Sequence, residues 1–405
     1  MRPLLRQILK GLNVVLSKSF DSTRLIKFLV LLSVFLFWFS HYVYLPTLPQ
    51  YVLLKTGTLT QVGIVLAMYG LWQAVVRLPI GIITDKIGHR KTFILAGIML
   101  AGIGALVMGF SGAFLGLTFG RSLVGLSMGA WVLQVVFFGS LFRDEEMIKA
   151  GSILTLASSL AKMAGTFATG YLNSSGGYLT AFLVSATAAA FSLLVLLSVP
   201  DSSAHLNSSH PPFKIGLVFR NPKVRYVSLM AAVNQFLNFG LVFGFFPLIV
   251  QEMGANDIIK SYLLTVNIFC LIAGNVLVTS IGKSENSVRL LAVSYLLFAV
   301  GIIFTPFAGG VGLLFLLQAL LGFAHGIGYP VLIGVCMEDI PDNGRASAMG
   351  FHQSVYAVGM FLGPWLCGIL AERHGLDATF IVTGAAALLI SYVLLFFLRH
   401  AVYQY

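Results

Sequence analysis

Long apolar segments alternate with short polar connections along the whole chain. The apolar runs fall near residues 26–50, 60–83, 91–111, 114–139, 152–171, 176–199, 226–250, 258–281, 289–308, 311–335, 346–370 and 379–398. Each run comes close to the roughly 20 residues that a helix needs to cross a bilayer. Since backbone polar groups in lipid must be satisfied within their own segment, we predict an all-α membrane protein with 12 transmembrane helices.

A hydrophilic stretch divides these runs into two sets of six. The expected parts are a basic cytoplasmic N-terminal segment (1–25), a six-helix bundle (26–199), a cytoplasmic central loop (200–225), a second six-helix bundle (226–398) and a cytoplasmic tail (399–405). The halves resemble each other weakly, because a proline lies near the outer end of both the first and the seventh run. Two such halves related by pseudo-two-fold symmetry, with a site at the membrane midplane, are a transporter architecture.

The composition excludes a soluble protein of this length. Apolar residues make up 58% of the 405 residues and charged residues 10%, whereas soluble domains carry roughly 25% charge. The net charge of +11 does not indicate nucleic acid, because no soluble domain is present to carry a basic face. The three cysteines all lie in apolar runs, so we expect no disulfide framework, no metal site and no cofactor.

The basic residues set the expected orientation. With the N-terminus in the cytoplasm, only Lys55, Lys260 and Arg373 of the connecting lysines and arginines fall outside. By the positive-inside rule, both termini are expected in the cytoplasm of a multi-pass protein of the cell (plasma) membrane. The stretch 3–18 has apolar residues at helical spacing, which fits either a helix on the membrane surface or a disordered basic tail.

The connection between the second and third runs carries a specific motif. Its defined positions are Gly81, Asp85, Lys86, Gly88, Arg90 and Lys91. This motif resembles the loop 2–3 signature of the major facilitator superfamily at every defined position, and the second run is similar to that of its drug:proton-antiporter-like branch. Further similar motifs supply the packing residues Gly125 and Gly129 in the fourth run and Gly363 and Pro364 in the eleventh. The resemblance implies solute transport by alternating access.

The family resemblance also implies a gating role for the loop motif. In the family, the motif aspartate meets the N-terminal end of helix 11 in the outward-facing state, which would bring Asp85 to the helix start near residues 345–347. A carboxylate placed there is worth roughly 0.3–1 kcal/mol, a scale that suits a latch which opens in every cycle. The basic motif residues are expected to pair with the acids at 144–146. The alternative is a basic loop that only fixes orientation.

Two departures weaken an exporter assignment. The corresponding loop of the second half, which ends at Gly282 and Lys283, lacks the aspartate. The fifth run lacks the Gly-Pro pair that is usual in antiporters of the drug type.

Ionisable residues within the predicted helices are the candidates for substrate binding and coupling. No Asp or Glu falls at midplane depth, whereas Arg121, Lys162, His41 and His325 fall within the predicted bilayer. An arginine stays protonated, so a central cavity with fixed positive charge and no fixed negative charge favours an anion. The alternatives are structural: Arg121 stabilises its helix, Lys162 reaches toward the interface, and the histidines are satisfied hydrogen-bonding groups.

Amides and aromatic side chains complete the expected site. The amides are Asn234, Gln235, Asn238 and Gln73, and the aromatic candidates include Trp131 and Tyr42. Interhelical hydrogen bonds and lipid-facing bulk are the alternatives.

The prediction is a monomeric secondary active or facilitative transporter of small organic solutes, biased toward anionic or amphipathic substrates. Its coupling is to protons, to a counter-ion or to neither. The alternative is a proton-coupled multidrug efflux transporter, which requires a membrane carboxylate that the sequence lacks. With no phosphate-binding loop and no catalytic cluster, an enzyme is not expected.

Overall fold

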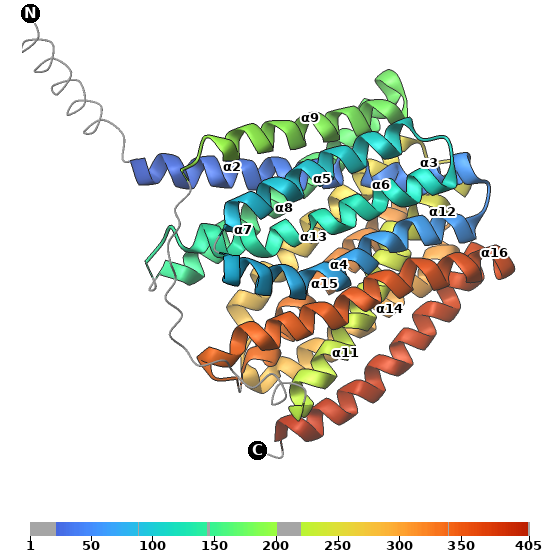
Figure 1. Cartoon of the computed structure of the whole chain (residues 1–405). Coiled ribbons are helices and arrows are strands. Elements are labelled where there is room, and N and C mark those ends of the chain that lie inside the picture. Colours follow the sequence, from blue (N-terminus) through green and yellow to red (C-terminus); the bar gives the residue numbers. More distant parts are fainter. Residues whose placement is uncertain (1–21, 88, 144–145, 201–219, 339, 404–405) are drawn as a thin grey trace, which may run out of the picture.

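The computed structural model describes residues 22–87, 89–143, 146–200, 220–338 and 340–403. Across these residues the chain forms a bundle of long helices that run roughly alongside one another (Figure 1). The start of α2 and the end of α16 lie at the same end of the bundle (Figure 1). We call this the proximal end, and the opposite end, where α3 lies, the distal end.

The first half of the chain supplies the first six membrane-crossing segments. Its elements are α2 (Ser22–Tyr42), η1 (Leu45–Thr47), α3 (Leu48–Thr56), α4 (Leu59–Ile87), α5 (Arg90–Phe110), α6 (Phe114–Ser127), α7 (Gly129–Gly139), α8 (Met147–Gly176) and α9 (Tyr178–Leu197). The second half comprises α11 (Pro222–Leu237), η3 (Asn238–Phe245), α12 (Phe246–Glu252), α13 (Asp257–Ile281), η4 (Ser284–Asn286), α14 (Ser287–Phe304), η5 (Thr305–Phe307), α15 (Val311–Met337) and α16 (Asp342–Tyr403).

The first and seventh segments are broken helices. The first runs on past the predicted limit of 50 to Thr56, and it is interrupted where Pro46 and Pro49 begin new helical pieces. In the seventh, the π-helical η3 precedes Pro247 of α12. A proline has no N–H to donate to the preceding turn, which explains a break at each of these places. The π-helix also widens the turn that carries Asn238.

The structure has the predicted twelve segments. Ten helical stretches in its described part are long and apolar enough to cross a membrane. The last of them, Ser347–Ala401, contains two helices that meet at Gly375. Gly375 has a φ of 83°, a left-handed conformation that glycine adopts readily, and this single residue replaces the loop predicted between 370 and 379. The remaining segment, the fifth along the chain, is the 30-residue α8, which is not among the ten stretches.

The four predicted packing residues lie where helices approach closely. A Cβ on Gly125 would lie 2.9 Å from the Met68 carbonyl oxygen, and one on Gly129 would lie 3.0 Å from Ile80 Cδ1. Both glycines therefore let α6 and α7 pack against α4. On α16, Gly363 meets the backbone of α11 and η3, and the Pro364 carbonyl meets Gly63 of α4. The second of these contacts joins the two halves of the chain.

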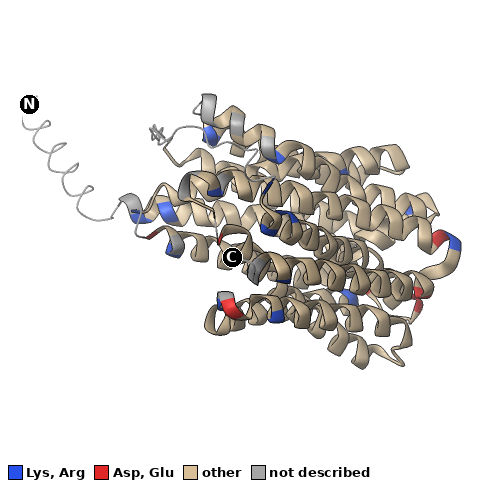
Figure 2. Ribbon diagram, turned by 90° about the horizontal axis from the view of Figure 1, so that it is seen from below, with Lys and Arg blue, Asp and Glu red and all other residues tan. Residues whose placement is uncertain are grey.

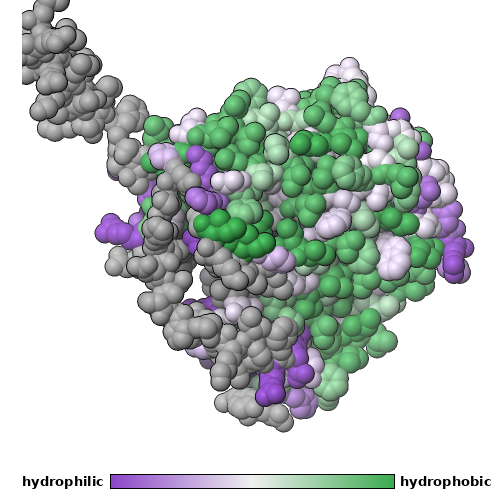
Figure 3. Space-filling view, in the orientation of Figure 1, coloured by the Kyte–Doolittle hydropathy of each residue, from purple (hydrophilic) through white to green (hydrophobic). Residues whose placement is uncertain are grey.

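The surface matches a lipid environment. Apolar side chains cover the middle of the face seen in Figure 3, and polar groups gather at its ends. Exposed large apolar side chains include Leu115, Leu389 and Phe396. Lysines and arginines are most frequent at the proximal end (Figure 2), which fits the expected cytoplasmic position of that end.

Candidate substrate cavity

A cavity of about 480 Å³ lies between the two halves of the chain. Its walls come from α2, α4, α7 and α8 of the first half and from α11, η3, α13, α15 and α16 of the second. On α4 the lining residues are Tyr69, Gln73 and Arg77, whereas Gly63, nearer the distal end, packs against α16. The cavity therefore occupies the middle and proximal part of the bundle.

The wall from the first half is aromatic and positively charged. The rings of Trp38 and Trp131 meet edge to face, with centroids 5.1 Å apart and an interplanar angle of 78°. Lys162 Nζ lies 3.9 Å from the centroid of the Trp38 ring and 5.6 Å from that of Tyr42. In the described part of the chain this ammonium group has no hydrogen bond and no ion pair, so its three donors remain available to the cavity.

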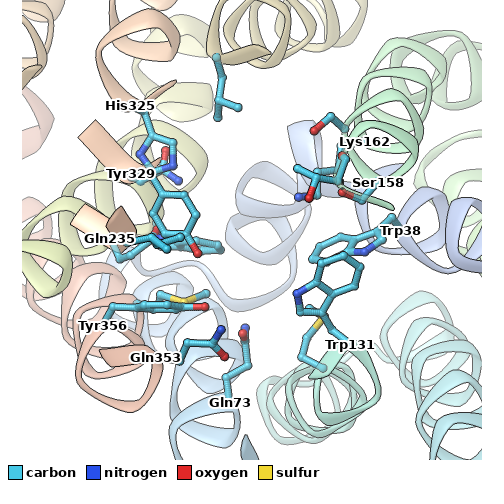
Figure 4. Close-up of a pocket in the computed structure, with 18 of the residues that line it drawn as sticks. Trp38, Gln73, Trp131, Ser158, Lys162, Gln235, His325, Tyr329, Gln353 and Tyr356 are labelled. Atoms are coloured by element: carbon cyan, nitrogen blue, oxygen red, sulfur yellow. Dashed lines mark hydrogen bonds between the residues drawn. The ribbon is translucent and has the colours of Figure 1, made fainter. Parts of the chain in front are cut away.

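The facing wall presents a flat pair of rings and polar atoms without partners. His325 and Tyr329, one turn apart on α15, stack with centroids 5.7 Å apart and an interplanar angle of 13°. Gln235 lies beside them (Figure 4). His325 Nδ1 and Gln235 Oε1 are buried without a hydrogen-bond partner among the described residues. Buried polar atoms are normally satisfied, so these two are candidates for contact with a ligand.

Arg77 joins the two halves beside the cavity. Its guanidinium donates to Gln73 Oε1 at 2.6 Å on its own helix, and across the interface to the Tyr356 hydroxyl and to Gln353 Oε1 at 3.4 Å. All three acceptors are neutral, so they solvate the charge without cancelling it. No Asp or Glu occurs among the described lining residues, and the cavity therefore carries the charges of Lys162 and Arg77 uncompensated.

Seven of the predicted site residues line this cavity. They are Lys162, His325, Gln235, Asn238, Gln73, Trp131 and Tyr42. Arg77 falls within a predicted helix but is absent from the predicted site residues, although it lies one helical turn from Gln73, which places both on one face of α4. It also missed Ser158, which lies one turn before Lys162 on α8 and shares its face.

Arg121 is not in the cavity, which corrects the expectation that it supplies the cavity's charge. It is 3% exposed, its Nη1 lies 3.4 Å from the Tyr44 hydroxyl, and its guanidinium lies over the Tyr69 ring at 4.4 Å. Because Tyr69 itself lines the cavity, Arg121 sits behind the wall. Its contacts are with residues of the neighbouring helices, which fits the structural alternative.

His41 and Asn234 also lie outside the lining. The two ring nitrogens of His41 are 2.8 Å from the Phe37 carbonyl and 2.9 Å from Ser127 Oγ, so this histidine is satisfied inside the first half. Asn234 is fully buried in α11, one residue from the lining residue Gln235. The structure thus places Gln235 in the cavity wall and the adjacent Asn234 outside it, although the sequence predicts both as site residues.

The loop motif is described only in part. Gly88 and the side chains of Asp85 and Lys86 lie outside the described residues, so the latch stays a prediction. Lys91 donates to the Leu197 carbonyl at 3.2 Å and to the Val199 carbonyl. It therefore binds the C-terminal end of α9, where carbonyls lack helical partners. Asp144 and Glu145, two of the acids with which it was expected to pair, lie outside the described residues.

The structure also describes Gly81 and Arg90 of the motif and one acid, Glu146, with which the motif was expected to pair. Gly81 has open space around its Cα, and Arg90 begins α5. Glu146, one of the acids expected to pair with the motif, lies 3.9 Å from Lys149 on the next turn.

Polar contacts close the distal end between the halves. Glu372 Oε2 on α16 accepts from the backbone N–H groups of Leu59 and Thr60, at 2.5 and 3.3 Å, at the start of α4. Asn173 Nδ2 on α8 donates to Asp257 Oδ2 on α13 at 2.9 Å. Both contacts lie at the end of the bundle away from the cavity.

Two sets of six helices around a central cavity define the class of secondary transporters. The chain belongs to the Major Facilitator Superfamily, whose sequence profile matches residues 30–283 and 228–403. Together these ranges cover most of the chain, which confirms the resemblance seen in the loop motif.

Named relatives of this chain are bacterial transporters. The bacillibactin exporter of Bacillus subtilis is 23% identical over 366 residues, 84% of this chain and 90% of that protein. A probable 4-methylmuconolactone transporter of Cupriavidus pinatubonensis is 26% identical over 350 residues, 80% and 76% of the two chains. Other matches are partial: the inner membrane transport protein YajR of Escherichia coli is 28% identical over 167 residues, 40% of this chain and 36% of that protein. An uncharacterized transporter of Buchnera aphidicola is likewise matched over 40% of its length.

Solved structures share the fold. A bacterial homologue of the human lysosomal transporter Spinster, in an inward-facing and occupied conformation, superimposes with a TM-score of 0.76 at 15% identity, covering 95% of this chain and 97% of that one. The human organic anion transporter MFSD10 gives a TM-score of 0.68 at 16% identity, covering 93% and 100%. At these identities the likeness concerns the fold alone.

Proposed function

We propose that this protein is a secondary active or facilitative transporter that moves small organic anions by alternating access. One observation carries the proposal: Lys162 and Arg77 line a central cavity that has no carboxylate among its described residues. The membership in a transporter family and the transporter names of the relatives support the transport activity.

An uncompensated cation is costly in a cavity of this kind. A cavity between helices in lipid has a low effective dielectric constant, in which charge–charge interactions are several times stronger than in water. The indole ring beneath Lys162 offers only a cation–π contact, worth about 0.5–2 kcal/mol. A bound anion would supply the missing negative charge, whereas an organic cation would add to the repulsion.

The size and lining of the cavity fit a small amphipathic molecule. A volume of about 480 Å³ lies within the roughly 300–1,000 Å³ of ordinary ligand pockets. The lining combines rings such as Trp38, Trp131 and Tyr329 with a few polar groups. With the termini in the cytoplasm, closure at the distal end makes this an inward-facing arrangement.

Proton-coupled multidrug efflux is the second candidate function. It is favoured by a partial relative, the multidrug resistance protein MdtG of Proteus mirabilis, which is 30% identical over 164 residues, 39% of this chain and 40% of that protein. The described lining, which contains no carboxylate, favours the anion transporter instead.

A binding panel tests the proposal. Purified protein is screened by thermal unfolding against carboxylates and amines of matched shape, such as hexanoate with hexylamine and benzoate with benzylamine. We expect carboxylates to raise the unfolding temperature and Lys162→Gln to abolish most of that shift. Lys149→Gln makes the same charge change at an exposed position of the same helix and should leave the shift intact. Stabilisation by amines alone would contradict the proposal, and uptake of the best ligand into proteoliposomes would establish transport.

A further inference from the structure

The cavity also indicates a chemical class of anion. Building on the proposed function, we propose that the substrate is an aromatic carboxylate that carries a hydroxyl group. Lys162 binds the carboxylate, and the ring lies between the Trp38–Trp131 pair and the His325–Tyr329 pair.

Lys162 and Arg77 are not equivalent as anion sites. Both terminal nitrogens of Arg77 already donate to Gln73, Tyr356 or Gln353. The ammonium of Lys162 contacts only aromatic rings, and Figure 4 shows its side chain on the wall opposite His325. A carboxylate that enters the cavity can therefore bind Lys162 without breaking an existing hydrogen bond. Lys162 is the anchor, and Arg77 adds long-range positive charge while it holds the two halves together.

Aromatic side chains stand on both sides of the open space. Figure 4 shows Trp38 and Trp131 on one wall and Tyr329 on the other. The near-parallel His325–Tyr329 stack presents a flat surface, and the edge-to-face tryptophan pair offers both a ring face and a ring edge. Planar rings pack on such surfaces in offset-stacked or edge-to-face geometry, with an attraction beyond simple burial of area. A saturated ring of the same size lacks that attraction.

Six buried polar atoms of lining residues have no hydrogen-bond partner among the described residues: Trp38 Nε1, Gln73 Nε2, Arg77 Nε, Gln235 Oε1, Asn275 Oδ1 and His325 Nδ1. Three of them, from both halves of the chain, are assigned to a hydroxyl group of the substrate. Gln73 Nε2 is a donor without a partner, Gln235 Oε1 is an acceptor without a partner, and His325 Nδ1 also lacks one, among the described residues. These side chains are 1%, 6% and 7% exposed, and all three line the cavity. A hydroxyl donates one hydrogen bond and accepts others, so it matches this mixed set. A ligand without such a group would leave these atoms unpaired, which sites of this kind penalise strongly.

Four probes separate the parts of this inference. The parent is 4-hydroxybenzoate; 4-hydroxycyclohexanecarboxylate removes only the aromatic ring, benzoate only the hydroxyl, and 4-hydroxybenzamide only the charge. Dissociation constants are measured by calorimetry on the full chain in detergent. We expect the saturated acid to bind roughly 5- to 10-fold more weakly, which corresponds to one ring contact. Benzoate and the amide should each bind at least tenfold more weakly.

The four dissociation constants test the anion function and the two parts of this inference separately. Equal binding of the amide would overturn the anion function itself. Equal binding of the saturated acid, or of benzoate, would overturn the aromatic or the hydroxyl part of the inference and leave the anion function standing. Failure of all four probes, while other carboxylates bind, would overturn the whole inference.

Variants locate the ring and the carboxylate. Trp131→Leu should lower the preference for 4-hydroxybenzoate over its saturated analogue, a ratio that a general folding defect does not change. Trp365→Leu is the matched control, because Trp365 is 36% exposed on the outer surface and stacks on Phe361 outside the cavity. Lys162→Gln should weaken 4-hydroxybenzoate at least tenfold and bring it level with the amide. Binding that is unchanged in Lys162→Gln would overturn the assignment of the anchor.

Discussion

The distal end of the bundle contains a buried charged pair whose removal should have a large effect. The Lys260 side chain is fully buried, and its Nζ lies 2.9 Å from Asp257 Oδ1. Among the described residues, Asp257 is the carboxylate that forms an ion pair with this ammonium group. Asp257 is 22% exposed and also accepts from Asn173 of the other half. One carboxylate thus neutralises a buried ammonium and links the two halves.

The expected magnitude follows from this geometry. At 2.9 Å and an effective dielectric constant of about 20, the attraction is roughly 6 kcal/mol, part of which is offset by desolvation. Removing one partner leaves the other charge buried, at a cost of about 3–5 kcal/mol, whereas replacing both partners is often close to neutral. We therefore expect Asp257→Ala to lower the free energy of unfolding by about 3–5 kcal/mol. Lys260→Met should restore at least half of that loss in the double variant.

The measurement is a double-mutant cycle on the purified full chain. Reversible unfolding in mixed micelles with SDS, followed by tryptophan fluorescence, gives the free energies of the four proteins. The exposed pair Glu146 and Lys149, 3.9 Å apart on one helix, provides a matched cycle with an expected coupling of about 0.5 kcal/mol or less. If Asp257→Ala costs no more than Glu146→Ala, and Lys260→Met rescues nothing, the assignment of a buried, coupled pair is refuted.

Two further predictions concern the contact of α4 with α16. Glu372→Gln removes a charge from the N-terminus of α4 and should weaken distal closure by about 1 kcal/mol, roughly fivefold in the population of the distally open state. Distances between spin labels at Lys55 and His374, which are exposed on opposite halves, should then lengthen, and an unchanged distribution would count against a role of the Glu372 contact in distal closure. A Cβ on Gly70 would overlap the backbone at Met360, so Gly70→Ala should lower transport rate and thermal stability. Gly151→Ala, in open space on α8, should lower neither.

The sequence predicts the number and type of the helices because run length and apolarity decide them. It places the breaks less well: α3 extends the first segment to Thr56, and Gly375 alone separates the last two helices. Hydropathy averages over a window and is insensitive to a single left-handed residue or to a proline inside an apolar run. Individual prolines, and glycines in left-handed backbone conformations, therefore fix these details, and only the structure shows which of them do so.

The candidate site is predicted in its composition, but the charges are distributed differently. A helix surrounded by lipid and other helices is apolar on most faces, so hydropathy alone does not show which face meets the cavity. Arg121, His41 and Lys162 look alike by that measure, since each is an ionisable residue within a long apolar run. Only Lys162 lines the cavity.

Neighbours one helical turn away resolve this ambiguity, and they are visible in the sequence. Gly125 and Gly129 follow Arg121 at four-residue spacing and face α4, so Arg121 shares a face that is occupied by helix contact and its charge ends over Tyr69. Lys162 follows Ser158 by one turn, and Arg77 follows Gln73 by one turn, so each cation continues a polar stripe that lines the cavity. Small residues at this spacing allow a neighbouring helix to approach, whereas polar residues within a membrane helix face the bundle interior or a water-filled cavity. In this chain, the residues one turn away from each charge therefore distinguish Arg121, which belongs to helix packing, from Lys162 and Arg77, which line the cavity.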